Sequence, residues 1–163
     1  MQVRFLPGTH MYKAGQMYME KALKEAMKVK KTGGYPVGAV VVRGDEIISC
    51  GRNMVRELSD ATAHAEMVAI RKASKVMQSR NLNGCILYTT QEPCPMCAAA
   101  CVWAKLDGVV FGSRLKDMKK HVKNSGKTWR EFDIKAVSII KKGKPKLFLI
   151  KDFMRRECVE LFK

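Results

Sequence analysis

The chain has 163 residues, of which 47% are hydrophobic, and this length suffices for one compact domain but not for two of ordinary size. No run approaches the roughly 18 consecutive apolar residues that span a bilayer, and Met1–Tyr12 lacks the apolar core of a secretory signal. The composition thus argues against a membrane partner and predicts a single domain over residues 1–163, located in the cytoplasm.

The formal net charge of +16 is unevenly distributed. From Ser113 onward, 16 Lys and Arg stand against 6 Asp and Glu, so the last 51 residues carry a charge of +10. Such a surface attracts polyanions, although Lys-rich surfaces also serve solubility alone. RNA is therefore a candidate partner of the basic C-terminal part.

The first predicted element is an amphipathic helix over residues 17–31, which ends at Gly33-Gly34. Its apolar residues recur at helical spacing and are expected in the core: Met19, Leu23, Ala26 and Met27. Two short strands follow, at 37–42 and 46–50, around the turn-forming Arg43-Gly44-Asp45. This pair predicts a hairpin.

After a polar stretch, a helix is expected from His64 to about Arg80-Asn81. A strand at 85–90, a helix at 95–105 and a strand at 108–112 come next. Strand, helix and strand in this order predict a parallel pair and an α/β sandwich. The tail has a Lys-rich polar segment at 116–127, strand candidates at 134–140 and 146–150, and a terminal helix from Lys151.

The residues with chemical potential lie at the starts of the two central helices. His64-Ala65-Glu66 is followed, after 26 residues, by Pro93-Cys94-Pro95-Met96-Cys97. One imidazole and two thiolates give three protein ligands, which suits a catalytic Zn²⁺ because its fourth tetrahedral position must remain open to water. A structural zinc site would have four protein ligands. The sequence therefore predicts one Zn²⁺ per chain.

A helix N-terminus directs backbone N–H groups and positive potential toward such a site, which favours the thiolate form of Cys94 and Cys97. Zinc lowers the pKa of its bound water toward about 7. Glu66, two residues from His64, is the expected general acid and base and is not expected to bind the metal. The pattern His-x-Glu with Pro-Cys-x-x-Cys is typical of zinc-dependent deaminases.

The remaining cysteines are interpreted as reduced packing residues, because a chain of this length does not depend on disulfides. They are Cys50, Cys85, Cys101 and Cys158. Cys101, four residues after Cys97, could face the same way as a further ligand, but it should lie one turn deeper in the core.

Three segments resemble the cytidine deaminase-like superfamily, and within it the purine-acting branch with guanine deaminases and tRNA adenosine deaminases. They are Pro36-Val37-Gly38-Ala39-Val40, Asp60–Glu66 and Glu92–Cys97. The resemblance covers roughly residues 17–112. It implies a three-layer α/β/α sandwich with a five-stranded mixed sheet, and a homodimer.

The resemblance also implies a set of substrate-binding residues. Asn53 matches the asparagine of a Gly-x-Asn motif that contacts the purine ring in the family, the backbone N–H of Ala65 would lie near the base, and Val37 would line the pocket. Trp103, followed by Ala104, resembles the corresponding string of guanine deaminases, although a core tryptophan explains it equally well.

The first interpretation is hydrolytic deamination of a small nucleobase or nucleoside, with a guanine-type free base favoured. The tail offers no acidic residue at the place where guanine deaminases read the base edge, and Asp117 is a candidate only by proximity. A tRNA adenosine deaminase, a cytosine or cytidine deaminase, and a non-catalytic zinc-stabilised nucleic-acid-binding module are the alternatives.

Overall fold

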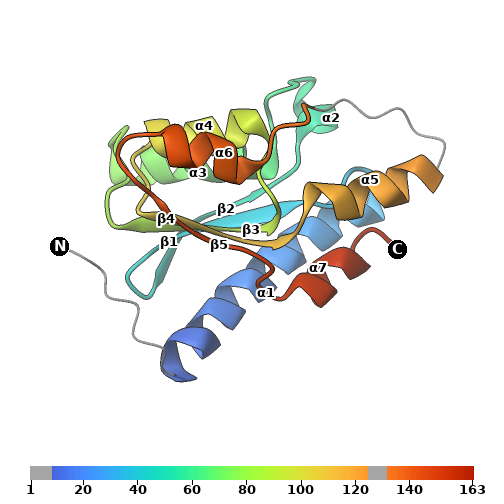
Figure 1. Cartoon of the computed structure of the whole chain (residues 1–163), viewed down its shortest axis with the longest axis horizontal. Helices are drawn as coiled ribbons and strands as arrows, with labels where there is room; N and C mark the ends of the chain where they lie inside the picture. Colours follow the sequence, from blue (N-terminus) through green and yellow to red (C-terminus); the bar gives the residue numbers. More distant parts are fainter. Residues whose placement is uncertain (1–8, 125–131) are drawn as a thin grey trace.

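The computed structural model describes residues 9–124 and 132–163, with side chains at 15–120 and 132–163. A five-stranded sheet in the order β2-β1-β3-β4-β5 lies between helices (Figure 1). Its strands are β1 Gly38–Arg43, β2 Glu46–Arg52, β3 Cys85–Gln91, β4 Gly108–Ser113 and β5 Phe148–Ile150. β1 pairs antiparallel with β2 and β3, whereas β3, β4 and β5 run parallel. This confirms the predicted α/β fold with a mixed sheet and the predicted hairpin.

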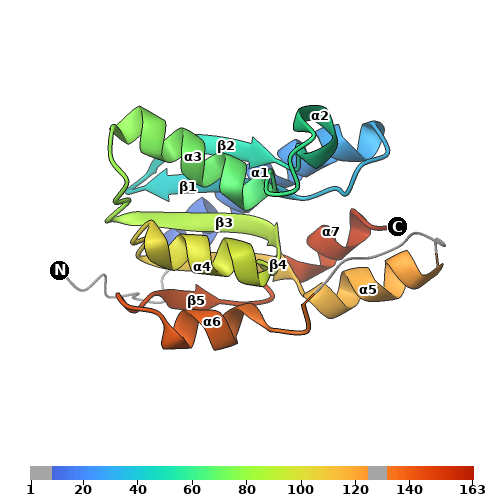
Figure 2. The same cartoon turned by 90° about the horizontal axis from the view of Figure 1, so that it is seen from above.

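The helices form two layers, one on each face of the sheet (Figures 1 and 2). On one face lie α3 Ala65–Met77, α4 Pro95–Trp103 and α6 Ala136–Lys142, and on the other lie α1 Thr9–Lys31 and α7 Arg155–Glu160. The one-turn helix α2 Val55–Leu58 precedes α3, and α5 Leu115–Asn124 follows β4. We call the side of the sheet that carries the first group the α3/α4 face.

Alternation along the central strands divides the core in two. In β1, Ala39 and Val41 belong to the cluster under α3 and α4, whereas Val40 and Val42 pack with α1. Both faces of this strand are buried, which explains its continuous apolar sequence. The apolar sequence of β1 therefore agrees with its place inside the sheet, between β2 and β3.

The predicted first helix is present, but its buried stripe differs from the one expected. Met19 and Ala26 are fully buried, whereas Met27 is 42% exposed. The residues that face the sheet are Tyr18, Met19, Ala22, Ala26 and Val29. Val29, seven residues after Ala22, continues the stripe with helical periodicity, and Met27 lies off it.

Within the described part of the tail, one predicted strand is wrong. The strand expected at 134–140 is the helix α6, in which the fully buried Ala136 and the buried Ile140 are four residues apart and pack under α4. β-branched residues suggested a strand, but the contacts with α4 favour the helical period. The Lys-rich segment 116–127 is helical as far as its described residues reach, and its end lies outside them.

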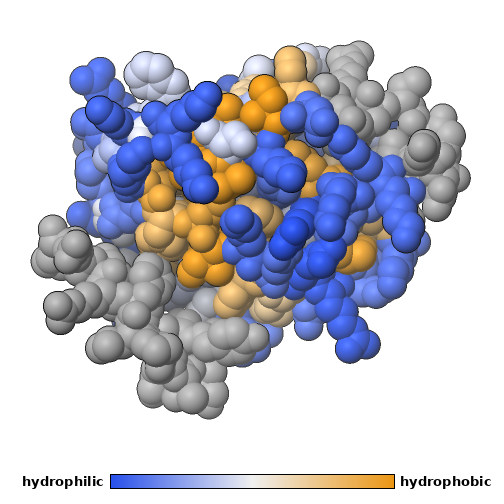
Figure 3. Space-filling model, in the orientation of Figure 1, coloured by the Kyte–Doolittle hydropathy of each residue, from blue (hydrophilic) through white to orange (hydrophobic). Residues whose placement is uncertain are grey.

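Hydrophilic residues cover most of the surface in Figure 3, and hydrophobic residues gather near the middle of that view. Within the described ranges, no helix combines the length and apolar character needed to cross a membrane. The expectation for Met1–Tyr12 concerns a segment that lies largely outside those ranges.

Candidate metal centre and active site

His64 and Cys94 occupy equivalent places in the fold, each as the N-cap of a helix. Their backbones are extended, with φ and ψ of −66° and 156° at His64 and −65° and 168° at Cys94. Pro95 opens α4, a position that proline tolerates because it lacks an N–H to satisfy, and Cys97 lies in the same first turn. Both ligand groups thus begin helices, as the sequence predicts.

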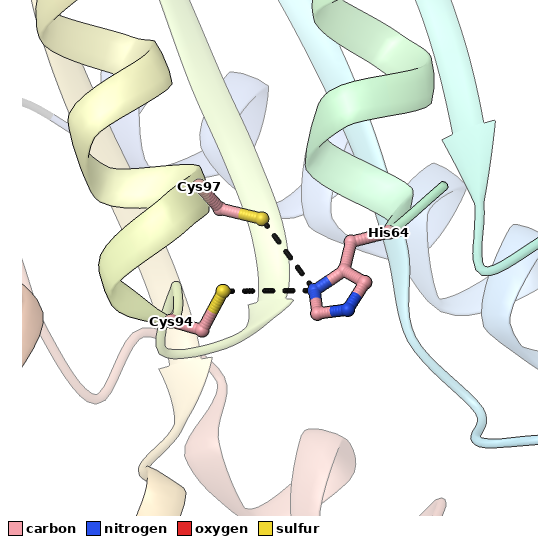
Figure 4. Close-up of side chains that lie close together, drawn as sticks. All are labelled: His64, Cys94 and Cys97. Carbon is pink, nitrogen blue, oxygen red and sulfur yellow. Dashed lines mark hydrogen bonds between the residues drawn. The ribbon is translucent and has the colours of Figure 1, made fainter. Parts of the chain in front are cut away.

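The three donor atoms converge between the two helix N-termini (Figure 4). Nδ1 of His64 lies 3.6 Å from Sγ of Cys94 and 3.6 Å from Sγ of Cys97. A single ring N–H cannot donate to both sulfurs. Zn–N and Zn–S bonds of roughly 2.05 and 2.3 Å in a tetrahedron produce an N–S separation of about 3.6 Å. The donors therefore fit a tetrahedral ion with one open position.

The pKa values of the two thiols are shifted in opposite directions. Hydrogen bonding from Cys97 lowers the pKa of Cys94 to about 4, and the bond to Cys94 also raises the pKa of His64. The Cys97 thiol donates a hydrogen bond to the Cys94 thiolate, and this bond, together with burial, raises the pKa of Cys97 well above its ordinary value. Metal binding would displace that remaining proton.

Glu66 lies in the first turn of α3 and is 4% exposed. Burial, followed by the negative charge of Cys94, raises the pKa of Glu66 to about 7. A carboxyl group in this range exchanges protons readily near neutral pH. Among the described residues, the candidate metal group contains His64, Cys94 and Cys97 and leaves Glu66 outside.

A glycine on the sheet sets the height of α3. A Cβ on Gly51 would lie 2.2 Å from the carbonyl oxygen of Ala65 and 2.6 Å from the nitrogen of Ala69. Ser49, two residues earlier on β2, donates a hydrogen bond of 2.7 Å to the carbonyl of Ala69. The helix that begins with His64 therefore lies directly against the backbone of β2.

Three of the predicted substrate-binding residues lie together at the start of α3. The N–H of Asn53 donates to the carbonyl of Val37 at 3.1 Å, and the Val37 side chain packs against the core cluster on the α3/α4 face of the sheet. The Asn53 side chain bonds to the backbone of Tyr35 and of Val55. Ala65 is the first residue of α3, where a backbone N–H has no acceptor within the helix. Contact of these residues with substrate stays a prediction.

Trp103, the fourth predicted substrate-binding residue, lies away from the metal ligands. It ends α4, nine residues after Cys94 and so about 13 Å along the helix axis, and it is 84% exposed. The alternative of a core tryptophan is therefore wrong. Its indole stands between two shallow grooves that combine apolar and basic residues: Ile70, Ala100, Ala104, Lys75 and Arg80 on one side and Ala99, Val102, Ile139, Lys142 and Lys144 on the other.

Glu92 is a buried polar residue whose role sequence reasoning missed. It is 8% exposed, and its carboxylate accepts hydrogen bonds from the N–H of Leu115 at 3.2 Å and of Ala136 at 3.1 Å. These are the first residues of α5 and α6. A carboxylate before Pro93-Cys94 thus holds two tail helices next to the metal ligands. The sequence did not reveal this role because neither α5 nor α6 was predicted as a helix.

Asp117 does not serve the site directly. Its carboxylate accepts hydrogen bonds from Arg155 at 2.7 and 3.0 Å and from the N–H of Arg114 at 2.8 Å. Arg114 in turn pairs with Asp152. This network joins the start of α5 to α7 and leaves Asp117 occupied by Arg155.

The other cysteines are free thiols, as expected. Cys101 is a fully buried residue of α4 that packs into the core, and burial strongly raises its pKa. Cys85 and Cys158 are likewise buried, whereas Cys50 is half-buried. Their place in the core agrees with packing.

Comparison with known proteins identifies one family, and its relatives include both tRNA adenosine deaminases and guanine deaminases. Residues 13–113 match the family described as the cytidine and deoxycytidylate deaminase zinc-binding region. Over 98 residues, 60% of the chain, the sequence is 44% identical to the tRNA-specific adenosine deaminase of Aquifex aeolicus and spans 65% of it, just under two thirds. Over 119 residues it is 39% identical to the guanine deaminase of Bacillus subtilis, covering 72% of the chain and 76% of that enzyme.

A structural match agrees with these relatives. A chain from a study of A-to-I editing by tRNA:A34 deaminases superposes with a TM-score of 0.70 at 29% identity, covering 90% of this chain and 99% of that one. The sheet and its helices are therefore shared with a deaminase over nearly the whole length.

Proposed function

Because the chain belongs to the family of the cytidine and deoxycytidylate deaminase zinc-binding region, we propose that it hydrolytically deaminates an aminated purine base or nucleoside, with a guanine-type free base as the favoured substrate. The observation that carries the proposal is the convergence of His64, Cys94 and Cys97 on one point beside the buried Glu66. Three ligands and an adjacent carboxyl group match the needs of a hydrolytic zinc site.

Zinc, when bound to the three donors, supplies a water molecule that ionises near neutral pH. Glu66 would take one proton from that water and deliver it to a ring nitrogen of the base, where it stays, and would then carry the second proton, from the hydroxyl on the ring carbon, to the exocyclic amine. The water oxygen forms a bond to the ring carbon, the carbon–nitrogen bond to the amine breaks, and ammonia leaves. The base keeps a carbonyl where the amine was.

The proposed preference for a guanine-type base agrees with the 39% identity to the guanine deaminase of Bacillus subtilis. That likeness extends over 72% of the chain, whereas the likeness to the tRNA-specific adenosine deaminase of Buchnera aphidicola extends over 88% of it at 35% identity, so the choice of substrate rests on experiment. The test is ammonia release by zinc-loaded protein from guanine, adenine, cytosine and their nucleosides, with Glu66→Gln as the inactive control. Release from none of them would exclude a small-molecule deaminase.

A tRNA adenosine deaminase is the second candidate. It is favoured by the 44% identity to the Aquifex aeolicus enzyme and by exposed lysines of the tail: Lys135, Lys141, Lys142, Lys144 and Lys146. These side chains would neutralise phosphates, so binding should weaken steeply with salt. Inosine formation in tRNA, with salt-dependent binding, decides in its favour.

We also propose a homodimer that uses the surface around Trp103. A tryptophan that is 84% exposed between two grooves lined by apolar and basic residues is typical of a protein interface. The remaining alternative, a non-catalytic zinc module, predicts that Glu66→Gln leaves function intact. A deaminase predicts that this variant keeps zinc and loses turnover.

A further inference from the structure

Four residues form a row across the ends of four adjacent strands. Gln91 of β3 pairs with Ser113 of β4. Extending the β1–β3 register by two residues brings Val37 opposite Gln91, and the N–H of Asn53 donates to the carbonyl of Val37 at 3.1 Å. We call Asn53, Val37, Gln91 and Ser113 the edge row. Asn53 and Val37 are predicted substrate-binding residues, and Gln91 lies next to Val37 in this row.

The side chain of Gln91 belongs to the same side of the sheet as the metal ligands. On β3, Leu87 faces the core under α3 and α4, and Tyr88 faces α1. Gln91 lies four residues after Leu87 and therefore shares its face, which is also the face of its neighbour Val37. Cys94 follows three residues later, at the start of α4. Gln91 is thus the last residue of β3, at the end of the strand that leads to the N-terminus of α4.

The carboxamide oxygen of Gln91 is unusual because it is buried without a hydrogen-bond donor. Gln91 is 5% exposed, and its Oε1 has neither solvent nor a hydrogen-bond donor among the described residues. In contrast, the amide of Asn53 in the same row bonds to the backbone of Tyr35 and Val55. A buried acceptor without a donor lowers stability. Such an unpaired acceptor beside a metal centre indicates a ligand that supplies the missing hydrogen-bond donor.

The chemistry of the amide indicates the ligand. A carboxamide presents an acceptor and a donor side by side, which complements a lactam edge, N–H beside C=O. Guanine carries this edge at N1 and C6, next to the amine at C2, and the edge remains intact while that amine leaves. In adenosine the donor of the base is the amine that leaves. On the basis of the function proposed above, we propose that Gln91 reads the lactam edge of a 2-aminated purine.

Binding to zinc-loaded Glu66→Gln protein tests this independently of turnover. Calorimetric titration with guanine and with 2-aminopurine, which lacks N1–H and the carbonyl, should give at least about tenfold tighter binding of guanine. Adding Gln91→Leu should weaken guanine binding about tenfold or more and change 2-aminopurine binding less than about twofold, so the preference disappears. The melting temperature should stay equal or rise, because an unpaired buried amide has been removed.

Thr89→Val is the matched control. Thr89 lies on the same face of β3, is fully buried and likewise has an unpaired hydroxyl, but it is two residues farther from Cys94. It should leave the preference unchanged. The assignment of Gln91 is overturned by equal weakening of both bases, by an equal effect of Thr89→Val, or by no guanine binding. Gln91-dependent guanine binding without wild-type turnover would support the assignment and count against the proposed function alone.

Discussion

Replacing Gly51 by alanine tests how closely α3 must lie against the sheet for the metal centre to form. The new Cβ would lie 2.2 Å from the carbonyl oxygen of Ala65, whereas ordinary contacts begin at 3.4 Å, so the helix must shift by about 1 Å. Metal–ligand distances tolerate about 0.2 Å, and His64 caps this same helix. We expect a loss of about 1–3 kcal/mol in unfolding free energy.

The effect on function should exceed the effect on stability. A ligand displaced by about 1 Å should weaken zinc binding some 10- to 100-fold, as loss of supporting contacts does elsewhere. Turnover at saturating zinc should fall by about 100-fold. Competition with a chromophoric chelator measures zinc affinity, ammonia release measures turnover, and urea unfolding measures stability.

Gly44→Ala is the control because Gly44, in the turn between β1 and β2, has a φ of +59° with open space around it. Its alanine variant should cost about 1–2 kcal/mol through backbone strain alone and leave zinc affinity unchanged. Zinc affinity and turnover of Gly51→Ala equal to those of the parent would show that the metal centre does not depend on how closely α3 lies against the sheet. The same conclusion would follow if both variants lost zinc affinity in proportion to their loss of stability.

Glu66→Gln should retain one zinc per chain by elemental analysis and lower kcat by about 10²–10⁴-fold; unchanged kcat would remove Glu66 from proton transfer. Cys94→Ser should lose zinc on gel filtration, and a chelator should lower the melting temperature of the parent and not of this variant. Trp103→Ser should convert the proposed dimer to monomer in sedimentation equilibrium, with association weakened about 30-fold or more. Burial opposes ionisation of Asp117, but hydrogen bonds from Arg155 hold its pKa below the ordinary value. The stabilisation they supply is present above a pH of about 3.9 and is lost as the pH falls through the lower folded pKa. Asp117→Asn should therefore unfold less steeply with acid below that pH, as followed by circular dichroism.

The sequence was most informative where chemistry and secondary structure coincide. His64 and Cys94 each precede a helical pattern, so both the ligand set and the helix N-caps could be predicted. The strands β1 and β3 were found because burial on both faces leaves most of their residues apolar, in residues 38–42 and 85–88. These features depend on local pattern alone.

Features that depend on tertiary contacts were less accessible. The residues 136–142 contain β-branched side chains, and only packing under α4 decides that Ala136 and Ile140 face the same way. Glu92 and Gln91 looked like ordinary polar residues before Pro93. Their importance appears once the sheet register and the tail helices are known.

The carboxylate of Glu92 ties together two helices that are 21 residues apart at their first residues. If either helix detached, this buried anion would lose one of its two donors, so each helix makes docking of the other more favourable. The tail should therefore open as one cooperative unit rather than as two. Native-state hydrogen exchange should show the amides of Leu115 and Ala136 exchanging with a common opening free energy, and the loop that carries Cys94 should loosen in the same event.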